Sequence, residues 1–293
     1  MSRLMVLAAA VTAALVLAGP GSAGGRAAAA GGAATVPQRI ISLSPTATGT
    51  LYAIGAGKQV VAVDEQSTWP KDAPRTSLSG YTPNVEAIAG YKPDLVVISY
   101  NPNGLAQSLD RLGIRVLEQD TAKSLADAYA QIVQLGQATG HLKQARGLVA
   151  KMKAQIAKIV SRRAADAKGL SVYHELEPDL YTATSKTFIG QVYSLFGLRN
   201  IADAADTTGS GYPKLSPEYV VQQSPDIIVL ADIRCCGTSA RTVATRPGWG
   251  DIRAVRTGTI VRVDDSVASE WGPRIVDFVR AVGAALKHLH PGR

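Results

Sequence analysis

The 293-residue sequence contains only two cysteines, Cys235 and Cys236, and they are neighbours. Adjacent cysteines can close only a small ring, so the pair excludes a disulfide framework that would tie distant segments together. Three states remain for these side chains: a disulfide between neighbours, two free thiols, or contacts to a soft metal ion.

Long apolar runs are also scarce, because only residues 4–18 form one near the N-terminus and no later run approaches membrane-spanning length. The run follows the basic residue Arg3, ends before Gly19-Pro20, and is shorter than the ~20 residues that a membrane span needs. This pattern is typical of a secretory signal peptide. We therefore expect residues 1–34 to be a cleaved signal and a low-complexity linker, and the protein to be exported. Since neither cysteine lies near the run, we expect no lipid anchor at a lipobox cysteine.

Signatures of several enzyme classes are missing. The sequence has no G-x-S-x-G elbow, no P-loop and no G-x-G-x-x-G after its first predicted strand. A zinc site built on a histidine cluster is disfavoured, because only His141 and His174 lie away from the C-terminal tail. These absences favour a protein that is not an enzyme.

The formal net charge is +8, and eight arginines lie between Arg234 and Arg280. No RNA-binding or DNA-binding motif accompanies them, so we expect no nucleic-acid partner. An anionic ligand or simple solubility explains the charge.

From residue 38 onward, short apolar runs alternate with amphipathic stretches. Strands are predicted at residues 39–44, 59–65, 95–99 and 114–120, with helices at 45–57, 84–94 and 104–113. The alternation resumes after Gly169, with strands at 170–176, 200–204, 226–231 and 259–265 and helices at 187–197 and 216–225. Each series predicts a parallel sheet covered by helices on both faces.

Residues 121–167 are almost purely helical in pattern, with one break at Thr139-Gly140. The second part, from His141 to about Ala167, has an apolar stripe on one face and would span roughly 40 Å. We expect it to connect two lobes.

The sequence "VEAIAGYKPDLVVIS" at residues 85–99 is followed 132 positions later by "PEYVVQQSPDIIVLA" at 217–231. A second set of matches aligns at an offset of 141: Ser44, Thr46, Gly49, Tyr52 and Val60 with Ser185, Thr187, Gly190, Tyr193 and Ile201. A period this long indicates duplicated domains. The predicted fold is α/β, with two Rossmann-like lobes that each hold a parallel sheet, at residues 35–121 and 169–293. The helical segment 122–168 joins them, and a ligand cleft faces the carboxyl ends of the strands.

Several ordered segments carry a family resemblance: "RIISLSPTATGTLYAIGAG", "VEAIAGYKPDLVVIS", "LEPDLYTATSKTFIGQVYSLFGLRNI", "LSPEYVVQQSPDIIVLA" and "GPRIVDFVRAVGAAL". They resemble the vitamin B12 and iron-siderophore class of ABC-transporter substrate-binding proteins, and most of all its vitamin B12-binding branch. The resemblance covers residues 39–286. It implies a monomer that captures a corrinoid or ferric siderophore and delivers it to a membrane permease powered by an ATPase, with little closure of the lobes on binding. It also implies that Glu86 and Glu218, one on each lobe, dock the permease. An alternative role for both is to stabilise their own helix at its N-terminus.

Aromatic residues in the predicted strand-end loops are candidate ligand contacts, because they offer large apolar area with a polar edge. These residues are Trp69, Tyr81, Tyr100, Tyr212 and Trp271. Tyr81 and Tyr212 hold related positions ahead of Glu86 and Glu218. The vitamin B12 branch tends to place tryptophans near these two points, where this sequence has Gly80 and Tyr212 instead. Because the sequence departs from that branch here, corrinoid, siderophore and haem all stay open as ligands.

Other side chains are candidates for metal or anion contacts. His174 could coordinate iron or cobalt, although a lone histidine is often a structural hydrogen-bonding group. Cys235 and Cys236 directly follow a predicted strand and could face the cleft, and Arg234 and Arg274 could contact phosphate or carboxylate groups. A different class of function also stays open: a redox or metal-sensing protein that uses Cys235 and Cys236.

Overall fold

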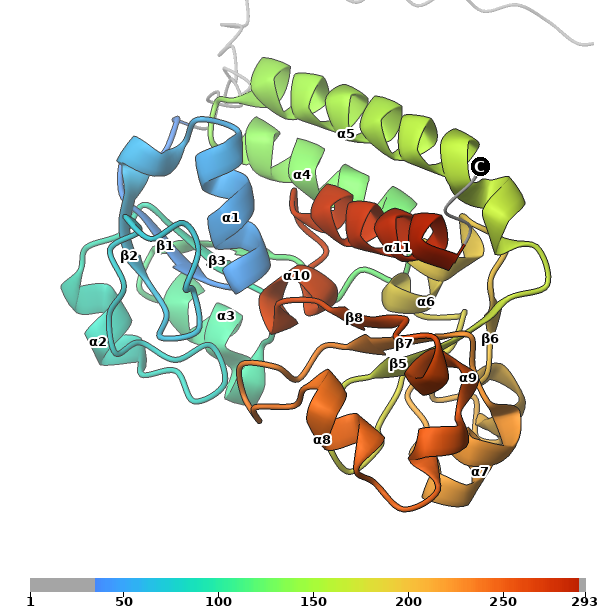
Figure 1. The fold of residues 1–293 in the computed structure, drawn as a ribbon. Helices are drawn as coiled ribbons and strands as arrows, with labels where there is room; N and C mark the ends of the chain where they lie inside the picture. The colour runs from blue at the N-terminus through green and yellow to red at the C-terminus, as the bar shows by residue number, and fades with distance from the viewer. Residues whose placement is uncertain (1–34, 290–293) are drawn as a thin grey trace, which may run out of the picture. The chain divides into compact units, whose positions relative to one another are not determined.

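The structure is a computed structural model that describes residues 35–289 (Figure 1). The predicted signal peptide and linker at residues 1–34 lie outside the described residues. From Val36 onward the chain forms one compact unit. The sequence places boundaries between the two lobes and the helical segment after residues 121 and 168, and these boundaries stay a prediction.

The N-terminal sheet contains four parallel strands in the order β2-β1-β3-β4. The strands are β1 (Ile40–Leu43), β2 (Val60–Val63), β3 (Leu95–Ile98) and β4 (Arg115–Glu118), and the helices between them are α1 (Pro45–Ala53), α2 (Val85–Gly90) and α3 (Leu105–Asp110), with short 3₁₀ turns at Gly57–Gln59 and Pro102–Gly104. Strands β1 and β3 are buried over their whole length, as expected for the inner strands of a parallel sheet. Helix α1 begins sharply, because the side chain of Ser44 accepts a hydrogen bond from the Ala47 N–H and Pro45 fits the first turn.

The C-terminal sheet repeats this topology, with parallel strands in the order β6-β5-β7-β8. Its strands are β5 (Ser171–Glu175), β6 (Arg199–Asn200), β7 (Ile227–Leu230) and β8 (Ile260–Arg262). Its helices are α6 (Phe188–Ser194), α7 (Pro217–Gln223), α8 (Ala240–Ala244), α9 (Arg253–Arg256), α10 (Asp265–Ser269) and α11 (Ile275–Leu289), with 3₁₀ turns at Asp203–Ala205 and Trp249–Asp251. In both sheets the first strand lies between the second and the third. The duplicated α/β architecture predicted from the repeat is therefore confirmed.

Two helices occupy the segment between the sheets, α4 (Leu125–Ala138) and α5 (Leu142–Arg163). They are separated at the predicted Thr139-Gly140 break, where Gly140 has a φ of +79° that favours glycine. The predicted length of the second helix was wrong. Helix α5 has 22 residues and is about 33 Å long. It ends at Arg163 because Ala164–Ala167 form a 3₁₀ turn. The last residue of the helix, Arg163, pairs with Asp166 of this turn at 3.1 Å.

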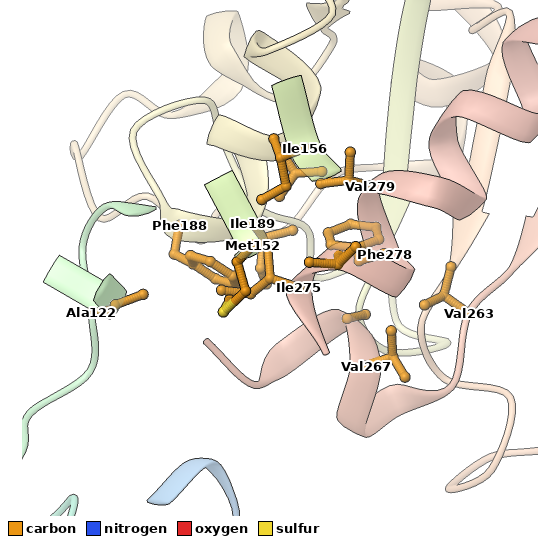
Figure 2. Close-up of a cluster of buried hydrophobic side chains, with 14 of the residues drawn as sticks. Ala122, Met152, Ile156, Phe188, Ile189, Val263, Val267, Ile275, Phe278 and Val279 are labelled. Atoms are coloured by element: carbon orange, nitrogen blue, oxygen red, sulfur yellow. The ribbon is translucent and has the colours of Figure 1, made fainter. Parts of the chain in front are cut away.

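Helix α5 packs against both α4 and α11 (Figure 1). Figure 2 shows Met152 and Ile156 of α5 against Ile275 and Val279 of α11. These side chains belong to a continuous hydrophobic cluster that draws buried residues from both sheets. The opposite face of each sheet has its own smaller cluster. The shared core holds the two lobes together through the helical layer.

Candidate functional site

A cavity of about 690 Å³ lies where loops of the two lobes meet. Most of its lining residues follow the carboxyl ends of β1, β2, β3, β4, β7 and β8, which is where ligands bind in open α/β sheets. The lining residues are Leu43, Ser44, Pro45, Thr46, Asp64, Gln66, Thr68, Gly80, Tyr81, Ser99, Tyr100, Thr121, Arg234, Cys235, Asp265, Ser266, Ser269, Glu270 and Trp271. We call this cavity the interlobe pocket.

Two other cavities are less suited to hold a specific ligand. One of about 620 Å³ lies along α4 and α5, and one of about 730 Å³ lies along α7 and the Trp249 turn. In the latter, the guanidinium of Arg246 is already engaged, because it donates to both carboxylate oxygens of buried Glu175 at 2.6 and 2.7 Å. The interlobe pocket combines residues of both lobes and presents more polar groups.

Two predicted tyrosines lie side by side at the interlobe pocket. The ring centroids of Tyr81 and Tyr100 are 6.4 Å apart with an interplanar angle of 48°, and the side chains are 70% and 56% exposed. A single exposed ring is ordinary, but two neighbouring rings make an exposed apolar patch, and such patches often mark a binding surface. This patch lies at the interlobe pocket.

The predicted residue Trp271 also lines the interlobe pocket. Its indole N–H donates to Oε1 of Gln131 on α4 at 2.7 Å, so the ring is held in place by the helical layer. A fixed aromatic ring loses little entropy when it contacts a ligand.

The loop after β7 brings Arg234 and Cys235 to the interlobe pocket. Asp265 fixes it there, because its carboxylate accepts hydrogen bonds from the backbone N–H groups of Arg234 at 3.1 Å and Cys235 at 2.9 Å. The Arg234 guanidinium donates to Asp264 at 3.3 Å. Cys235 and Cys236 form a disulfide, which is one of the three states predicted for them. Both are exposed, but Cys236 is not part of the lining.

The structure does not place His174 at the interlobe pocket. His174 lies on β5 with no exposed surface, and its Nδ1 is 2.5 Å from the hydroxyl of Tyr193. Burial lowers the pKa of His174 to about 3, so the ring is neutral at physiological pH. The predicted metal coordination by His174 in the cleft is therefore not supported: this residue belongs to the shared core, where it also packs edge-on against Phe278.

Tyr212 does not mirror Tyr81, although the two precede Glu218 and Glu86 at related positions in the sequence. Tyr212 is 42% exposed and lies outside the lining of the interlobe pocket. The physical reason is a backbone pairing of the C-terminal lobe: Thr182 N–H donates to the Pro213 carbonyl, and Thr184 N–H donates to the Gly211 carbonyl. The N-terminal lobe lacks this long connection, because β1 there runs directly into α1.

Trp69 and Arg274 are not part of the lining of the interlobe pocket. The Arg274 guanidinium lies 5.6 Å from the centroid of the Trp69 ring and donates to the lining residue Ser266 at 2.7 Å. The two residues form a contact between the lobes, and Arg274 holds Ser266 in position. They therefore support the pocket and do not line it, whereas the sequence predicted that they contact the ligand directly.

Sequence reasoning missed two acidic lining residues, Asp64 and Glu270. Burial raises the pKa of Asp64 to about 6, against the lowering effect of hydrogen bonds from Ser67. Burial also raises the pKa of Glu270 to about 7, opposed by Arg274 and reinforced by Asp264 and Asp64. The signal for Asp64 was available, because this residue directly follows the apolar run Val60–Val63 within the strand predicted at residues 59–65. Glu270 lies beside Trp271, which was predicted for its ring alone.

Within residues 35–289 there is no group of three or more histidine, cysteine or acidic side chains that could hold a metal ion.

A family described as periplasmic binding protein matches residues 40–267. The chain belongs to this family. An uncharacterized ABC transporter substrate-binding lipoprotein of Bacillus subtilis, YvrC, is 32% identical over 260 residues, which cover 85% of this chain and 80% of that protein. A cobalamin-binding protein of Halobacterium salinarum is 33% identical over 249 residues, which cover 82% of this chain and 67% of the relative. The family predicted from the sequence is thus confirmed.

A solved structure gives the same fold. The periplasmic heme-binding protein RhuT of Roseiflexus sp. RS-1, in apo form, superposes with a TM-score of 0.74 at 25% sequence identity. The superposition covers 86% of this chain and 98% of that protein. The two-lobe α/β architecture is therefore that of a periplasmic binding protein.

The two glutamates predicted to dock a permease hold equivalent places in this periplasmic binding protein. Glu86 is the second residue of α2 and Glu218 the second residue of α7, and both side chains are exposed. Each helix is capped in the same way, by Asn84 accepting from the Ala87 N–H at 2.9 Å and by Ser216 accepting from the Tyr219 N–H at 3.1 Å. The caps already satisfy a first-turn N–H of each helix, so the carboxylates are not needed for that bond.

Across residues 35–289, no helix combines the length and the apolar character that a membrane crossing demands.

Proposed function

We propose that this protein is the extracytoplasmic substrate-binding component of an ABC importer. It captures a metal chelate, either a corrinoid or a ferric siderophore, in the interlobe pocket and delivers it to a membrane permease with its ATPase. The observation that carries this proposal is a polar and aromatic pocket built from the strand ends of both lobes in a periplasmic binding protein.

The lining of the interlobe pocket fits a large ligand with both apolar and polar surface. The pocket of about 690 Å³ is within the range of ~300–1,000 Å³ that holds small molecules. Its open side, at the exposed rings of Tyr81 and Tyr100, allows a bulky chelate to extend beyond the cavity. The name of the cobalamin-binding relative supports a corrinoid as the first candidate.

Haem is a second candidate for the chelate. The heme-binding structural neighbour supports it, and two exposed tyrosines at the pocket offer phenolic oxygens that can bind ferric iron. A redox or metal-sensing function of Cys235 and Cys236 is a further alternative of another class. Replacing both cysteines with serine distinguishes this alternative from chelate capture. The double variant should lose activity if the protein is a redox or metal sensor, and should keep chelate binding and uptake largely intact if it is a chelate-binding protein.

The test is a calorimetric titration of the mature protein with cobalamin, cobinamide, haem and a panel of ferric siderophores. The proposal predicts one site per chain for at least one of these chelates. If none of them binds, the proposal that the protein captures a corrinoid or iron chelate is wrong.

A further inference from the structure

Two acidic side chains from different lobes line the interlobe pocket. Asp64 follows β2 in the N-terminal lobe, and Glu270 follows α10 in the C-terminal lobe. The charge of Asp64 raises the pKa of Glu270. We call these two residues the acid pair.

Asp64 is only 2% exposed and uses one of its two carboxylate oxygens internally. Its Oδ1 accepts from the Ser67 N–H at 3.1 Å and from the Ser67 hydroxyl at 2.5 Å. Among residues 35–289, no donor bonds to Oδ2. This oxygen lies next to Gly80, where a Cβ would be 3.5 Å away, so the missing side chain of Gly80 leaves Oδ2 open toward the pocket that both residues line. Because this acceptor is open to the pocket, a ligand N–H placed there can donate to it.

Glu270 is also left without a hydrogen-bond partner for its side chain in the described part of the chain. The nearby cation is Arg274, four residues further along the chain, but its guanidinium donates to Ser266 and lies over Trp69. The other charged groups that act on Glu270 are Asp264 and Asp64, and both raise its pKa. Arg274 therefore offsets the negative charge around Glu270 only in part.

The other acidic group of the lining, Asp265, already accepts two backbone N–H groups. Arg234 donates to Asp264 at 3.3 Å, and its side chain is 55% exposed. The acid pair thus provides the acceptors that are free for a ligand. A ligand carboxylate or catecholate placed there would meet like charge, whereas an amide or ammonium N–H would find an acceptor.

We propose that Asp64 and Glu270 select, within the proposed chelate class, ligands that present amide or ammonium N–H groups, and reject ligands that present negative charge at this position. The proposal rests on the proposed function and refines it. It favours a corrinoid, whose rim carries carboxamides, or an amine-bearing hydroxamate chelate, over haem with its free propionates.

The acid pair also makes this selectivity depend on pH. Burial holds the pKa of both carboxyls near neutrality, and the charges acting on them are Glu65 at Asp64, and Arg274, Asp264 and Asp64 at Glu270. Above pH 7 both are carboxylates and repel anions. At pH 5.5 Asp64 and Glu270 are mostly protonated, so their preference against anionic groups is weakened.

The test compares chelates that differ only by amide and carboxylate. We would titrate cobalamin against its monocarboxylate derivatives, and haem propionate-diamide against haem, at pH 8 and pH 5.5. The proteins are the wild type, Asp64→Asn, Glu270→Gln, and Asp110→Asn as control, because Asp110 is exposed, lies outside the lining and does not act on either acid. The wild type should bind the amide form of at least one pair about tenfold more tightly at pH 8, which is ~1.4 kcal/mol. This preference should shrink at pH 5.5 and in Asp64→Asn and Glu270→Gln, but not in Asp110→Asn.

Equal affinity for amide and carboxylate forms, or a preference that both variants retain, would overturn the role of the acid pair while leaving chelate capture intact. If no chelate binds at all, the proposed function fails, and the acid pair is tested without ligand. The measurement is then the pKa of Glu270 by NMR, which should fall in Asp64→Asn. An unchanged pKa would show that the two carboxyls do not face each other.

Discussion

At the scale of single residues, burial has opposite consequences for His174 and for the acid pair. The folded-state pKa of His174 is lowered to about 3, so its contribution to stability is present above about pH 6.5 and is lost as the pH falls toward 3. Asp64 and Glu270 have raised pKa values, so their contribution is present below about pH 4 and is lost as the pH rises through 6 to 7. Between these limits the two effects oppose each other.

The opposing effects predict how stability depends on pH in a variant that lacks the acid pair. In Asp64→Asn/Glu270→Gln, neutral amides replace the buried carboxylates, so the loss of stability between pH 4 and pH 7 should disappear. Relative to the wild type, the variant should gain on the order of 2 kcal/mol per site between pH 4 and pH 8. Urea denaturation at a series of pH values measures this difference. A difference between variant and wild type that is the same at pH 4 and pH 8 would contradict the raised pKa values.

The residue scale also shows the limit of prediction from sequence. The sequence indicated that aromatic side chains follow the strands, and Tyr81, Tyr100 and Trp271 do lie at the pocket. It could not show that Tyr212 is held elsewhere by backbone pairing with residues 182–184, or that His174 points into the core. Both depend on contacts between segments that are distant in the sequence.

At the scale of elements, the long periodic segments were predictable and the short ones were not. The apolar stripe of α5 and its start after Gly140 follow from the sequence, but no signal before Gly169 marks its end at Arg163, because the residues that follow are mostly alanine. Helices α8, α9 and α10 have only four or five residues, too few to show a period. The missed helix α10 leads directly to Glu270, which is one reason that the acid pair escaped the sequence analysis.

Two glycines of the helical layer give a matched prediction for element packing. A Cβ on Gly136 of α4 would collide with the Cβ of Ala145 on α5, whereas a Cβ on Gly147 of α5 would meet nothing within 4 Å. Gly136→Ala should therefore destabilise the protein by about 1–3 kcal/mol through overpacking. Gly147→Ala should stabilise it by about 0.5–1 kcal/mol, because alanine favours the helix. Chemical denaturation of both variants compares the same substitution in two settings. Equal effects would show that α4 and α5 do not approach each other closely.

At the scale of the whole molecule, the duplication gives both lobes the same arrangement of strands and helices around one pocket. Identical strand orders place the strand ends of both sheets at the interlobe pocket and place Glu86 and Glu218 at equivalent helix starts. The sequence repeat predicted this arrangement well, because equivalent residues occupy equivalent elements. It could not identify the ligand, since the pocket residues lie in loops that differ between the lobes.

The equivalent glutamates predict a separation of docking from ligand binding. Paired carboxylates suit a pseudo-symmetric protein that docks on a two-fold symmetric permease. Glu86→Arg/Glu218→Arg should lower uptake at least about tenfold in cells or proteoliposomes, with ligand affinity unchanged. The control is Glu118→Arg/Glu177→Arg, which reverses two other exposed charges and should leave uptake near the wild-type rate. Equal uptake by the two double variants would contradict the docking role.

The central claim is that the interlobe pocket holds the ligand, and the most direct measurement is a calorimetric titration of a variant whose pocket is obstructed. Thr121 is exposed and lines the pocket, so Thr121→Trp adds bulk there with little cost to the core. Thr207→Trp is the control, because Thr207 is exposed in the C-terminal lobe and lies outside the lining. With the chelate that binds the wild type most tightly, we predict one site per chain in the wild type and in Thr207→Trp, and affinity weakened at least about tenfold in Thr121→Trp. Equal affinity in all three proteins would contradict the assignment of the interlobe pocket as the ligand site.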